Sequence, residues 1–249
     1  MATRSLILLL ALVLAGCGKA DVAELLKQAS EASQLNSEDG WKDTHELLST
    51  CIEDHAVETS SVHDMRLVAL VRAGDTEAAA EAAEAAVAAN KTDFVANYLL
   101  GAMHIAAKRD QDAIPYLRTA HEERPDHVHT NLLFATCAGR LNLDEAEDLY
   151  KSLAESEAYD DPGHLYNELA VWYANRQQYP QAMSYFSKAG ERSQQNPLVF
   201  LNVAIVADLH MKKPDIARTY YLNFLYHANK KYPDREGRVR ARLRELSAL

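Results

Sequence analysis

A small residue followed four positions later by a bulkier one recurs through this chain at a nearly constant period. The small residues stand 33 to 36 positions apart, at Ala79, Ala113, Ala146, Ala182 and Ala217. Their partners are the weak member Ala83 and the bulky residues Leu117, Tyr150, Phe186 and Tyr221. Residues four apart lie on one face of a helix, and self-similarity at a period of this length is typical of repeat architectures. The sequence therefore predicts one extended solenoid of similar helical units.

The stretch from Phe94 to His127 shows what one unit contains. Apolar residues recur with helical spacing in both halves, and a polar break at residues 108–111 separates them. Pro125 ends the second half, because a proline ring cannot continue a helix. Each unit is therefore expected to consist of two helices joined by a turn.

Further positions repeat with the same period. A small residue stands in the middle of the first helix at Gly101, Ala135 and Ala170, and less clearly at Ala204. Small residues let two helices approach closely where a larger side chain would hold them apart. Together these positions resemble the tetratricopeptide repeat, a helix–turn–helix unit of 34 residues. The resemblance implies an all-α solenoid of about five to six helix pairs plus a C-terminal capping helix.

The chain divides into four segments on this basis. Residues 1–16 are a predicted signal peptide, and residues 17–59 a linker with a degenerate helix pair, broken at residues 36–40, that caps the solenoid. Residues 60–233 hold the repeats. Residues 234–249 form a basic capping helix whose arginines are expected to face solvent.

The first residues carry the signal that predicts where the protein resides. Residues 6–14 are a short apolar run, too short to span a bilayer comfortably. Residues 14–17, Leu-Ala-Gly-Cys, resemble the bacterial lipobox, which implies cleavage before Cys17 and lipidation of its thiol. Gly18 stands where an Asp would favour inner-membrane retention, so we expect the outer membrane, facing the periplasm. The alternative is an ordinary secretory signal with an accidental cysteine.

The other two cysteines, Cys51 and Cys137, fall in helices of different repeats. An exported compartment permits disulfides, but a solenoid joins mainly nearest neighbours. We therefore expect two buried free thiols.

Charge and motifs exclude several function classes. The formal net charge of −10 makes the chain too acidic for general nucleic-acid binding. There is no glycine-rich phosphate loop, no Gly-x-Ser-x-Gly and no His-Glu-x-x-His, so we expect neither an enzyme nor a bound cofactor. His121, His127 and His129 come nearest to a metal site, because the His-x-His spacing can bind zinc on a loop. A metal-binding or enzymatic protein that uses these three histidines stays open as an alternative.

The resemblance also implies a binding surface. In tetratricopeptide repeats the first helices of successive units line a concave groove, with groove residues at the second, fifth, ninth and twelfth positions of each unit. Here they include Tyr98, Ala102, His129, Leu132, Thr136, Arg140 (one position further along), His164, Asn167, Val171, Asn202, Val206 and His210. Asn167 and Asn202 resemble the asparagines with which chaperone-binding relatives hold a peptide, although the lysines of that clamp are missing. Alternatively, some of these residues only pack between units.

The sequence thus predicts a lipid-anchored scaffold or assembly factor of the cell envelope that binds a partner protein or peptide in this groove. It would touch the membrane through the lipid on Cys17. The chain is acidic over residues 19–90 and basic over its last forty residues, which would steer a charged partner or simply form solvated faces. A structural spacer with no specific partner is the second alternative.

Overall fold

In the computed structural model, residues 20–55, 57, 59–193 and 196–247 are described, and every regular element among them is a helix. The chain divides between Arg124 and Pro125 into two compact units. The first unit contains α2 (Ala20–Gln34), α3 (Glu38–Glu53), α4 (Ser60–Arg72), α5 (Thr76–Ala89), α6 (Phe94–Ala106) and α7 (Asp110–Glu123). The second contains α8 (Val128–Arg140), α9 (Glu145–Glu155), α10 (Pro162–Asn175), α11 (Tyr179–Arg192), α12 (Pro197–Ile205), the π-helical turn η1 (Val206–His210), α13 (Pro214–Ala228) and α14 (Pro233–Leu246).

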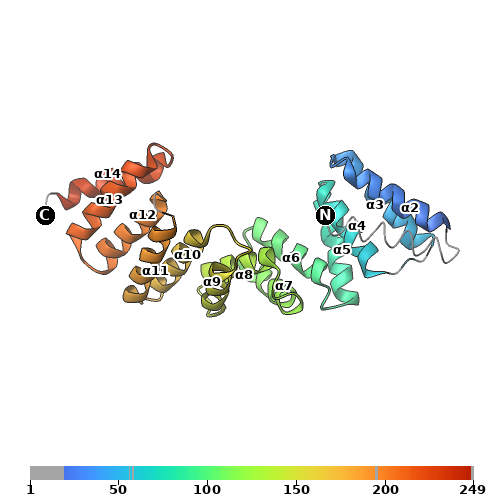
Figure 1. Cartoon of the computed structure of the whole chain (residues 1–249), viewed down its shortest axis with the longest axis horizontal. Helices are drawn as coiled ribbons and strands as arrows, with labels where there is room; N and C mark the ends of the chain where they lie inside the picture. Colours follow the sequence, from blue (N-terminus) through green and yellow to red (C-terminus); the bar gives the residue numbers. More distant parts are fainter. Residues whose placement is uncertain (1–19, 56, 58, 194–195, 248–249) are drawn as a thin grey trace. The chain divides into compact units, whose positions relative to one another are not determined.

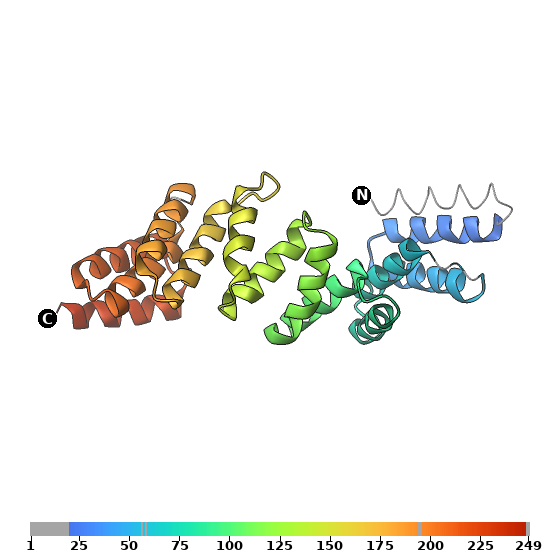
Figure 2. The ribbon, with the colours of Figure 1, turned by 90° about the horizontal axis from the view of Figure 1, so that it is seen from below.

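Successive helices pack as hairpins within each unit (Figures 1 and 2). In the first unit the pairs are α2 with α3, α4 with α5, and α6 with α7. In the second they are α8 with α9, α10 with α11, and α12 with α13, after which α14 packs on α13. The predicted all-α fold of helix pairs with one further C-terminal helix is confirmed.

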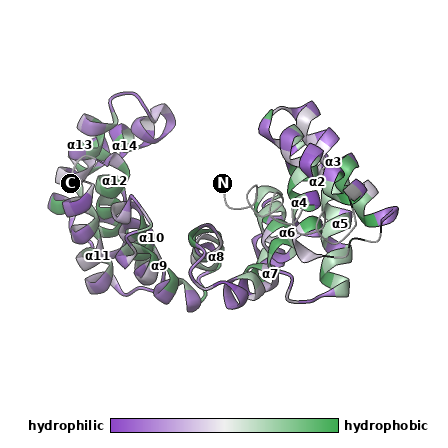
Figure 3. Ribbon diagram, turned by 45° about the vertical axis from the view of Figure 1, so that its right-hand side comes forward, coloured by the Kyte–Doolittle hydropathy of each residue, from purple (hydrophilic) through white to green (hydrophobic). Residues whose placement is uncertain are grey.

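The predicted repeat positions form the contacts inside these hairpins. All five alanines of the period are fully buried, and Leu117, Tyr150, Phe186 and Tyr221 are each at most 4% exposed. The small residue of the first helix faces the bulky one of the second: a Cβ at Gly101 would stand 2.6 Å from the Leu117 side chain. Helix α5 lacks a bulky member and is mostly pale green in Figure 3, the colour of its alanines. The periodic pattern therefore identified the helix faces that pack.

The turns inside the pairs share a backbone feature. A residue with positive φ follows the first helix at Asn36, Gly74, Lys108, Asn142, Gln177 and Lys212. In the four turns at Gly74, Lys108, Asn142 and Gln177 the next residue donates its N–H to the carbonyl five positions back, as Asp75 does to Leu70 and Arg109 to His104. This is the Schellman motif, which satisfies the last carbonyls of a helix. The turn is thus a repeated part of the unit, although only Gly74 is a glycine.

Two expected breaks are shorter in the structure. Helix α7 already begins at Asp110, and α3 begins at Glu38, where a break over residues 36–40 was expected. The reason at α3 is the Ser37 side chain, which accepts a hydrogen bond from the Gly40 N–H and caps the helix at that point. Gly40 lies inside α3, where a Cβ would stand 2.7 Å from the Ala32 carbonyl oxygen of α2. It therefore serves close helix packing instead of a turn.

The last pair departs from the others, because its first helix ends in the π-helical turn η1. The turn residue Lys213 donates to the Ala207 carbonyl, six positions back instead of five. One additional residue is thereby inserted into the last turn, and Asp208 comes to lie buried at 6% exposure. A π turn is uncommon and is often found at functional sites.

The cysteines of the described part behave as predicted: Cys51 and Cys137 are buried thiols outside any disulfide. Burial raises the pKa of the Cys51 thiol to about 11, so it stays protonated and unreactive. The predicted signal peptide and Cys17 lie outside the described residues. Among the described helices, none is both long enough and apolar enough to cross a membrane.

Candidate functional site

The first helices α8 and α10 of the second unit line a pocket of about 390 Å³. Four predicted groove residues lie on its wall: Thr136 and Arg140 from α8, and His164 and Val171 from α10. Arg140 and His164 are exposed, whereas Thr136 and Val171 are half-buried. The structure therefore brings together these four residues on one hollow surface.

Five residues that were not among the predicted groove residues complete the wall. They are Gly139, Tyr150, Glu168, Trp172 and Asn175. On α10 the wall positions 164, 168, 171 and 175 follow each other by four, three and four residues. This is the spacing of a single helical face, so a helical-wheel reading of α10 could have identified Glu168 and Asn175.

The part of the wall that α10 contributes is fixed to the turn before α9. The Trp172 indole N–H donates to the Leu143 carbonyl oxygen at 3.0 Å. The Arg176 guanidinium donates to the Asn142 carbonyl oxygen at 3.2 Å and lies 4.4 Å above the Trp172 ring. These contacts hold Trp172 in place before any ligand arrives, and such preorganisation reduces the entropy that binding costs.

Tyr150 and Gly139 form a buried part of the wall together. A Cβ at Gly139 would stand 2.6 Å from the Tyr150 hydroxyl oxygen, so a larger residue there would displace the ring. Burial and, to a lesser extent, the charge of Glu168 hold the pKa of the Tyr150 phenol well above its usual range. The hydroxyl therefore remains protonated at physiological pH and can act as a neutral donor or acceptor.

Charges of both signs border the pocket. Arg140 lies on the α8 side, and on α10 the His164 Nδ1 lies 4.0 Å from Oε1 of Glu168. The aliphatic hydroxyl of the wall, on Thr136, donates to the Leu132 carbonyl oxygen at 2.7 Å, so it is not directed at a catalytic base. A concave site that combines a few polar groups with the apolar surfaces of Val171, Trp172 and the Tyr150 ring suits reversible binding of a peptide-like ligand.

The two asparagines that were predicted to grip a peptide contact each other. The Asn202 amide donates to Oδ1 of Asn167 at 3.0 Å and links α12 to α10. Asn167 is only 4% exposed, and its own amide donates to Glu168 at 3.2 Å. In this structure Asn167 therefore joins neighbouring repeats, and a role in gripping a peptide stays a prediction.

The other predicted groove residues have varied surroundings. His129 is exposed and Leu132 is half-buried on α8, whereas Val206 is buried at 4% exposure. His210 is exposed and stacks on Tyr179, with ring centroids 5.4 Å apart. In the first unit, Tyr98 and Ala102 are half-buried on α6, and the Tyr98 ring stacks with Phe94 at 6.2 Å. Val206 thus packs inside the unit and offers little surface to a partner.

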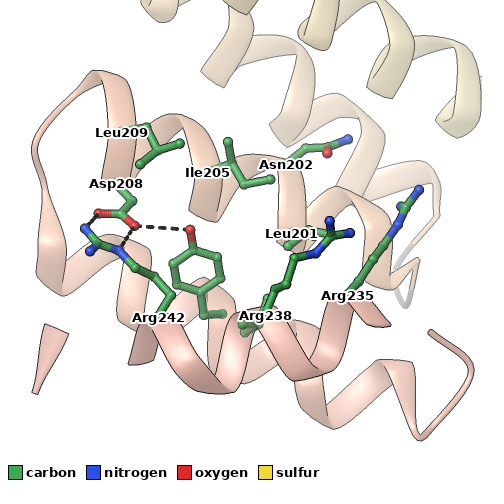
Figure 4. Close-up of a pocket in the computed structure, with 10 residues that line it drawn as sticks. Leu201, Asn202, Ile205, Asp208, Leu209, Arg235, Arg238 and Arg242 are labelled. Atoms are coloured by element: carbon green, nitrogen blue, oxygen red, sulfur yellow. Dashed lines mark hydrogen bonds and ion pairs between the residues drawn. The ribbon is translucent and has the colours of Figure 1, made fainter. Parts of the chain in front are cut away.

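Two arginines of the last helix pair with buried carboxylates: Arg240, which is exposed as expected, and Arg242, which is half-buried. Arg242 donates to both carboxylate oxygens of the buried Asp208, at 2.7 and 2.8 Å (Figure 4). Arg240 donates to the buried Glu236 at 3.2 Å. A buried carboxylate is costly unless it is paired, so each needs its arginine. Arg235 and Arg238 are exposed but border a second pocket, between α12–η1 and α14.

The alternative of a metal site finds no support in the described part of the chain. No group of three or more His, Cys, Asp or Glu side chains there is arranged to hold a metal ion. The His127 Nδ1 is engaged with Thr130, at 2.8 Å from its hydroxyl oxygen and 3.2 Å from its backbone nitrogen. His127 therefore caps α8.

Comparison with known proteins shows which solved structures have a similar fold. No protein-family model and no curated protein matches the sequence. Solved structures do match it, among them YrrB, described as a TPR protein with an unusual peptide-binding site. That match has a TM-score of 0.62 at 14% sequence identity and covers 72% of this chain and 91% of YrrB.

Two further matches are with MamA and with PilW, a widely conserved type IV pilus biogenesis factor. MamA matches with a TM-score of 0.54 at 16% identity, over 65% of this chain and 94% of MamA. PilW matches with a TM-score of 0.54 at 18% identity, over 69% of this chain and 79% of PilW. At such low identity the likeness shows the fold, which is that of a tetratricopeptide-like array of helix pairs.

Proposed function

We propose that this protein is a lipid-anchored scaffold or assembly factor of the bacterial cell envelope, which binds a partner protein or peptide on the first helices of its repeats. The observation that carries the proposal is the pocket between α8 and α10, where Thr136, Arg140, His164 and Val171 meet. Three of these residues were selected from repeat positions and Arg140 from the position after one, and the α10 part of their shared wall is held in place through Trp172. Residues for covalent chemistry are not arranged there, which favours binding over catalysis.

The envelope location rests on the sequence. The short apolar run at residues 6–14 and the Leu-Ala-Gly-Cys stretch that ends at Cys17 support lipidation. Several acyl chains on one cysteine would anchor the protein stably, whereas a single chain binds marginally. The likeness to PilW, a pilus biogenesis factor, is consistent with such a setting.

Site-specific photo-crosslinking in intact cells tests the binding surface. A photoreactive residue at Asn175, an exposed member of the pocket wall, should yield a discrete adduct with a partner protein. The matched control is Gln181, exposed on α11 and outside this pocket, where that adduct should be missing. Adduct formation at Asn175 should also fall when Arg140→Glu is introduced, and should persist with Arg218→Glu, an exposed change on α13 outside this pocket. Equal adducts at Asn175 and Gln181, or none at Asn175, would leave the spacer alternative as the better account.

A further inference from the structure

A second pocket of the same unit, of about 500 Å³, lies between α12–η1 and α14 (Figure 4). Its lining combines two kinds of side chain. Leu201, Ile205, Leu209 and Val239 contribute apolar surface, and Arg235 and Arg238 contribute guanidinium groups. Leu209 is 50% exposed, although a leucine at the end of a helix could readily be buried. Aliphatic surface and cations therefore meet in one accessible hollow.

The positive charge of this pocket is not cancelled from within. Its carboxylate, on Asp208, is already engaged by Arg242 through two hydrogen bonds and by the Tyr221 hydroxyl at 3.2 Å. Among the described residues, Arg238 has no ion-pair or hydrogen-bond partner, and Arg235 lies 5.8 Å above the Tyr232 ring without a carboxylate. The two arginines stand three positions apart, on one face of α14, so both can reach the same ligand.

We propose that this pocket binds an acidic peptide segment of the partner, with an aliphatic side chain against the leucine surface and carboxylate side chains on Arg235 and Arg238. The inference rests on the proposed function and names the class of peptide that the protein takes. Guanidinium groups bind carboxylates through paired, charge-assisted hydrogen bonds, which supplies the selectivity for acidic residues. The apolar surface supplies an anchor that a phosphate backbone would not use, so the pocket favours a peptide over a nucleic acid.

Binding of capped synthetic peptides to the purified full-length chain tests this assignment. The probe is a fluorescent dodecapeptide of leucine and glutamate pairs, acetylated and amidated so that no terminal carboxylate contributes. Versions with glutamine or lysine in place of glutamate have the same apolar content. We expect the glutamate peptide to bind about tenfold tighter than the glutamine peptide, and the lysine peptide to bind weakest. Equal affinities for the three peptides would overturn the proposal.

Charge reversal identifies the pocket as the source of this preference. Arg235→Glu combined with Arg238→Glu should weaken binding of the glutamate peptide by about tenfold or more and strengthen binding of the lysine peptide. The matched control is Arg244→Glu on the same helix, an exposed arginine outside the pocket, which should leave the preference unchanged. If the control shifts the preference as far as the double variant does, the effect is one of net charge and the proposal fails.

Three further measurements separate the possible failures. Leu209→Ala alters a half-exposed side chain and should weaken the binding of all three peptides equally, because it removes apolar contact without changing charge. An oligothymidylate of matching charge that binds more tightly than the glutamate peptide would overturn the choice of a peptide ligand. Crosslinking from Asn175 in the charge-reversed protein distinguishes a failure of this inference from a failure of the proposed function. If the charge-reversed protein still forms the adduct and keeps its preference for the glutamate peptide, only the assignment of the acidic peptide to this pocket is overturned. If it loses both the adduct and the preference, the assignment is supported.

Discussion

At the scale of single residues, the turns within the helix pairs show a conflict between sequence and backbone. Positive φ recurs at Gly74, Lys108, Asn142, Gln177 and Lys212, yet glycine occupies only the first of these positions. A left-handed conformation costs residues with a Cβ roughly 1 kcal/mol, and asparagine somewhat less. The surrounding hydrogen bonds of the Schellman motif impose it in spite of this cost. The turns at Lys108, Gln177 and Lys212 are therefore sites of stored local strain.

Releasing that strain should stabilise the protein. Gln177→Gly is expected to raise the free energy of unfolding by about 0.5–1 kcal/mol, because glycine adopts the φ of 61° without a steric penalty. Gln178→Gly is the control: this residue caps α11 with φ −90°, so glycine adds only flexibility and should destabilise. Urea denaturation of the two variants checks the difference in sign. Equal effects would mean that the turn at Gln177 relaxes in solution.

A second residue-scale effect concerns Asp64 on α4. Burial, together with the charge of Asp93, raises the pKa of its carboxyl to about 6, although Arg124 opposes the shift. A carboxyl with a raised pKa binds more protons in the folded state than in the unfolded state between its ordinary pKa and about 6. Stability contributed by this group therefore declines as pH rises through that window, and changes no further above it, where the carboxyl is ionised in both states.

Asp64→Asn should remove this dependence. The variant is expected to melt at a higher temperature than the wild type at pH 7.5, because it buries no charge. The difference should shrink towards pH 5, where Asp64 in the wild type is protonated. Melting curves of both proteins from pH 5 to 7.5 test this. A difference that stays constant over the range would show that Asp64 titrates normally.

At the scale of elements, the helix α14 is held by an interaction that its own sequence does not reveal. Arg242 lies 34 residues after Asp208, one repeat period away, and pairs with it through two hydrogen bonds. The hydrogen bond from Arg242 holds the pKa of Asp208 below its usual range, despite its burial. Such a carboxylate contributes stability above its ordinary pKa, and that contribution is lost as pH falls through the lowered value.

Asp208→Asn should therefore loosen α14 at neutral pH. We expect a lower melting temperature than the wild type at pH 7, with a smaller difference as the solution becomes strongly acidic. Limited trypsin digestion should also release C-terminal fragments sooner, because α14 is rich in arginine. Asp215→Asn, an exposed aspartate on α13, serves as the control and should digest like the wild type. Unchanged digestion of the Asp208 variant would mean that α14 is held by apolar packing alone.

The helix pair α10–α11 depends on a single large side chain. Phe186 is 2% exposed at the bulky position of the repeat, and Phe186→Ala should reduce the free energy of unfolding by about 3–5 kcal/mol. Gln181→Ala, an exposed change on the same helix, should stay within about 0.5 kcal/mol. Because each repeat is stabilised by its neighbours, the damage should spread first to the adjoining pairs. Denaturant midpoints measure the loss, and coinciding midpoints would mean that this side chain is not part of the core.

At the scale of the whole molecule, the proposed function needs both a binding surface and an anchor. Cys17→Ser removes the thiol that the lipobox resemblance marks for lipidation. The precursor should remain unprocessed by the lipoprotein peptidase and should incorporate no labelled fatty acid. Cys51→Ser, which alters a buried thiol in α3, is the matched control and should be labelled like the wild type. Equal labelling of the Cys17 variant would contradict the anchor and leave an ordinary secretory signal.

The sequence by itself determined the helix pairs and the faces on which they pack. Small and bulky residues four positions apart on the second helix of a pair, such as Ala113 with Leu117 and Ala182 with Phe186, are buried as predicted. This works because the requirement is local: where two antiparallel helices pack, a small residue of one lies opposite a large residue of the other, as Gly101 does opposite Leu117. The repeat positions also gave three wall residues of the α8–α10 pocket, Thr136, His164 and Val171, since a regular repeat presents equivalent positions on the same side.

Only the tertiary structure decided which polar side chains of neighbouring repeats meet. Asn202 donates to Asn167 and Arg242 to Asp208, at separations of 35 and 34 residues. The Arg176 guanidinium donates to the backbone carbonyl of Asn142, 34 residues before it. Each bond joins residues about one period apart, but the residue types differ from repeat to repeat, so no sequence pattern marks them. Asp208 itself lies in the π turn η1, which the helical periodicity of the sequence did not predict. Apolar packing tolerates many side chains and follows a local period, whereas a hydrogen bond requires two particular atoms within about 3 Å.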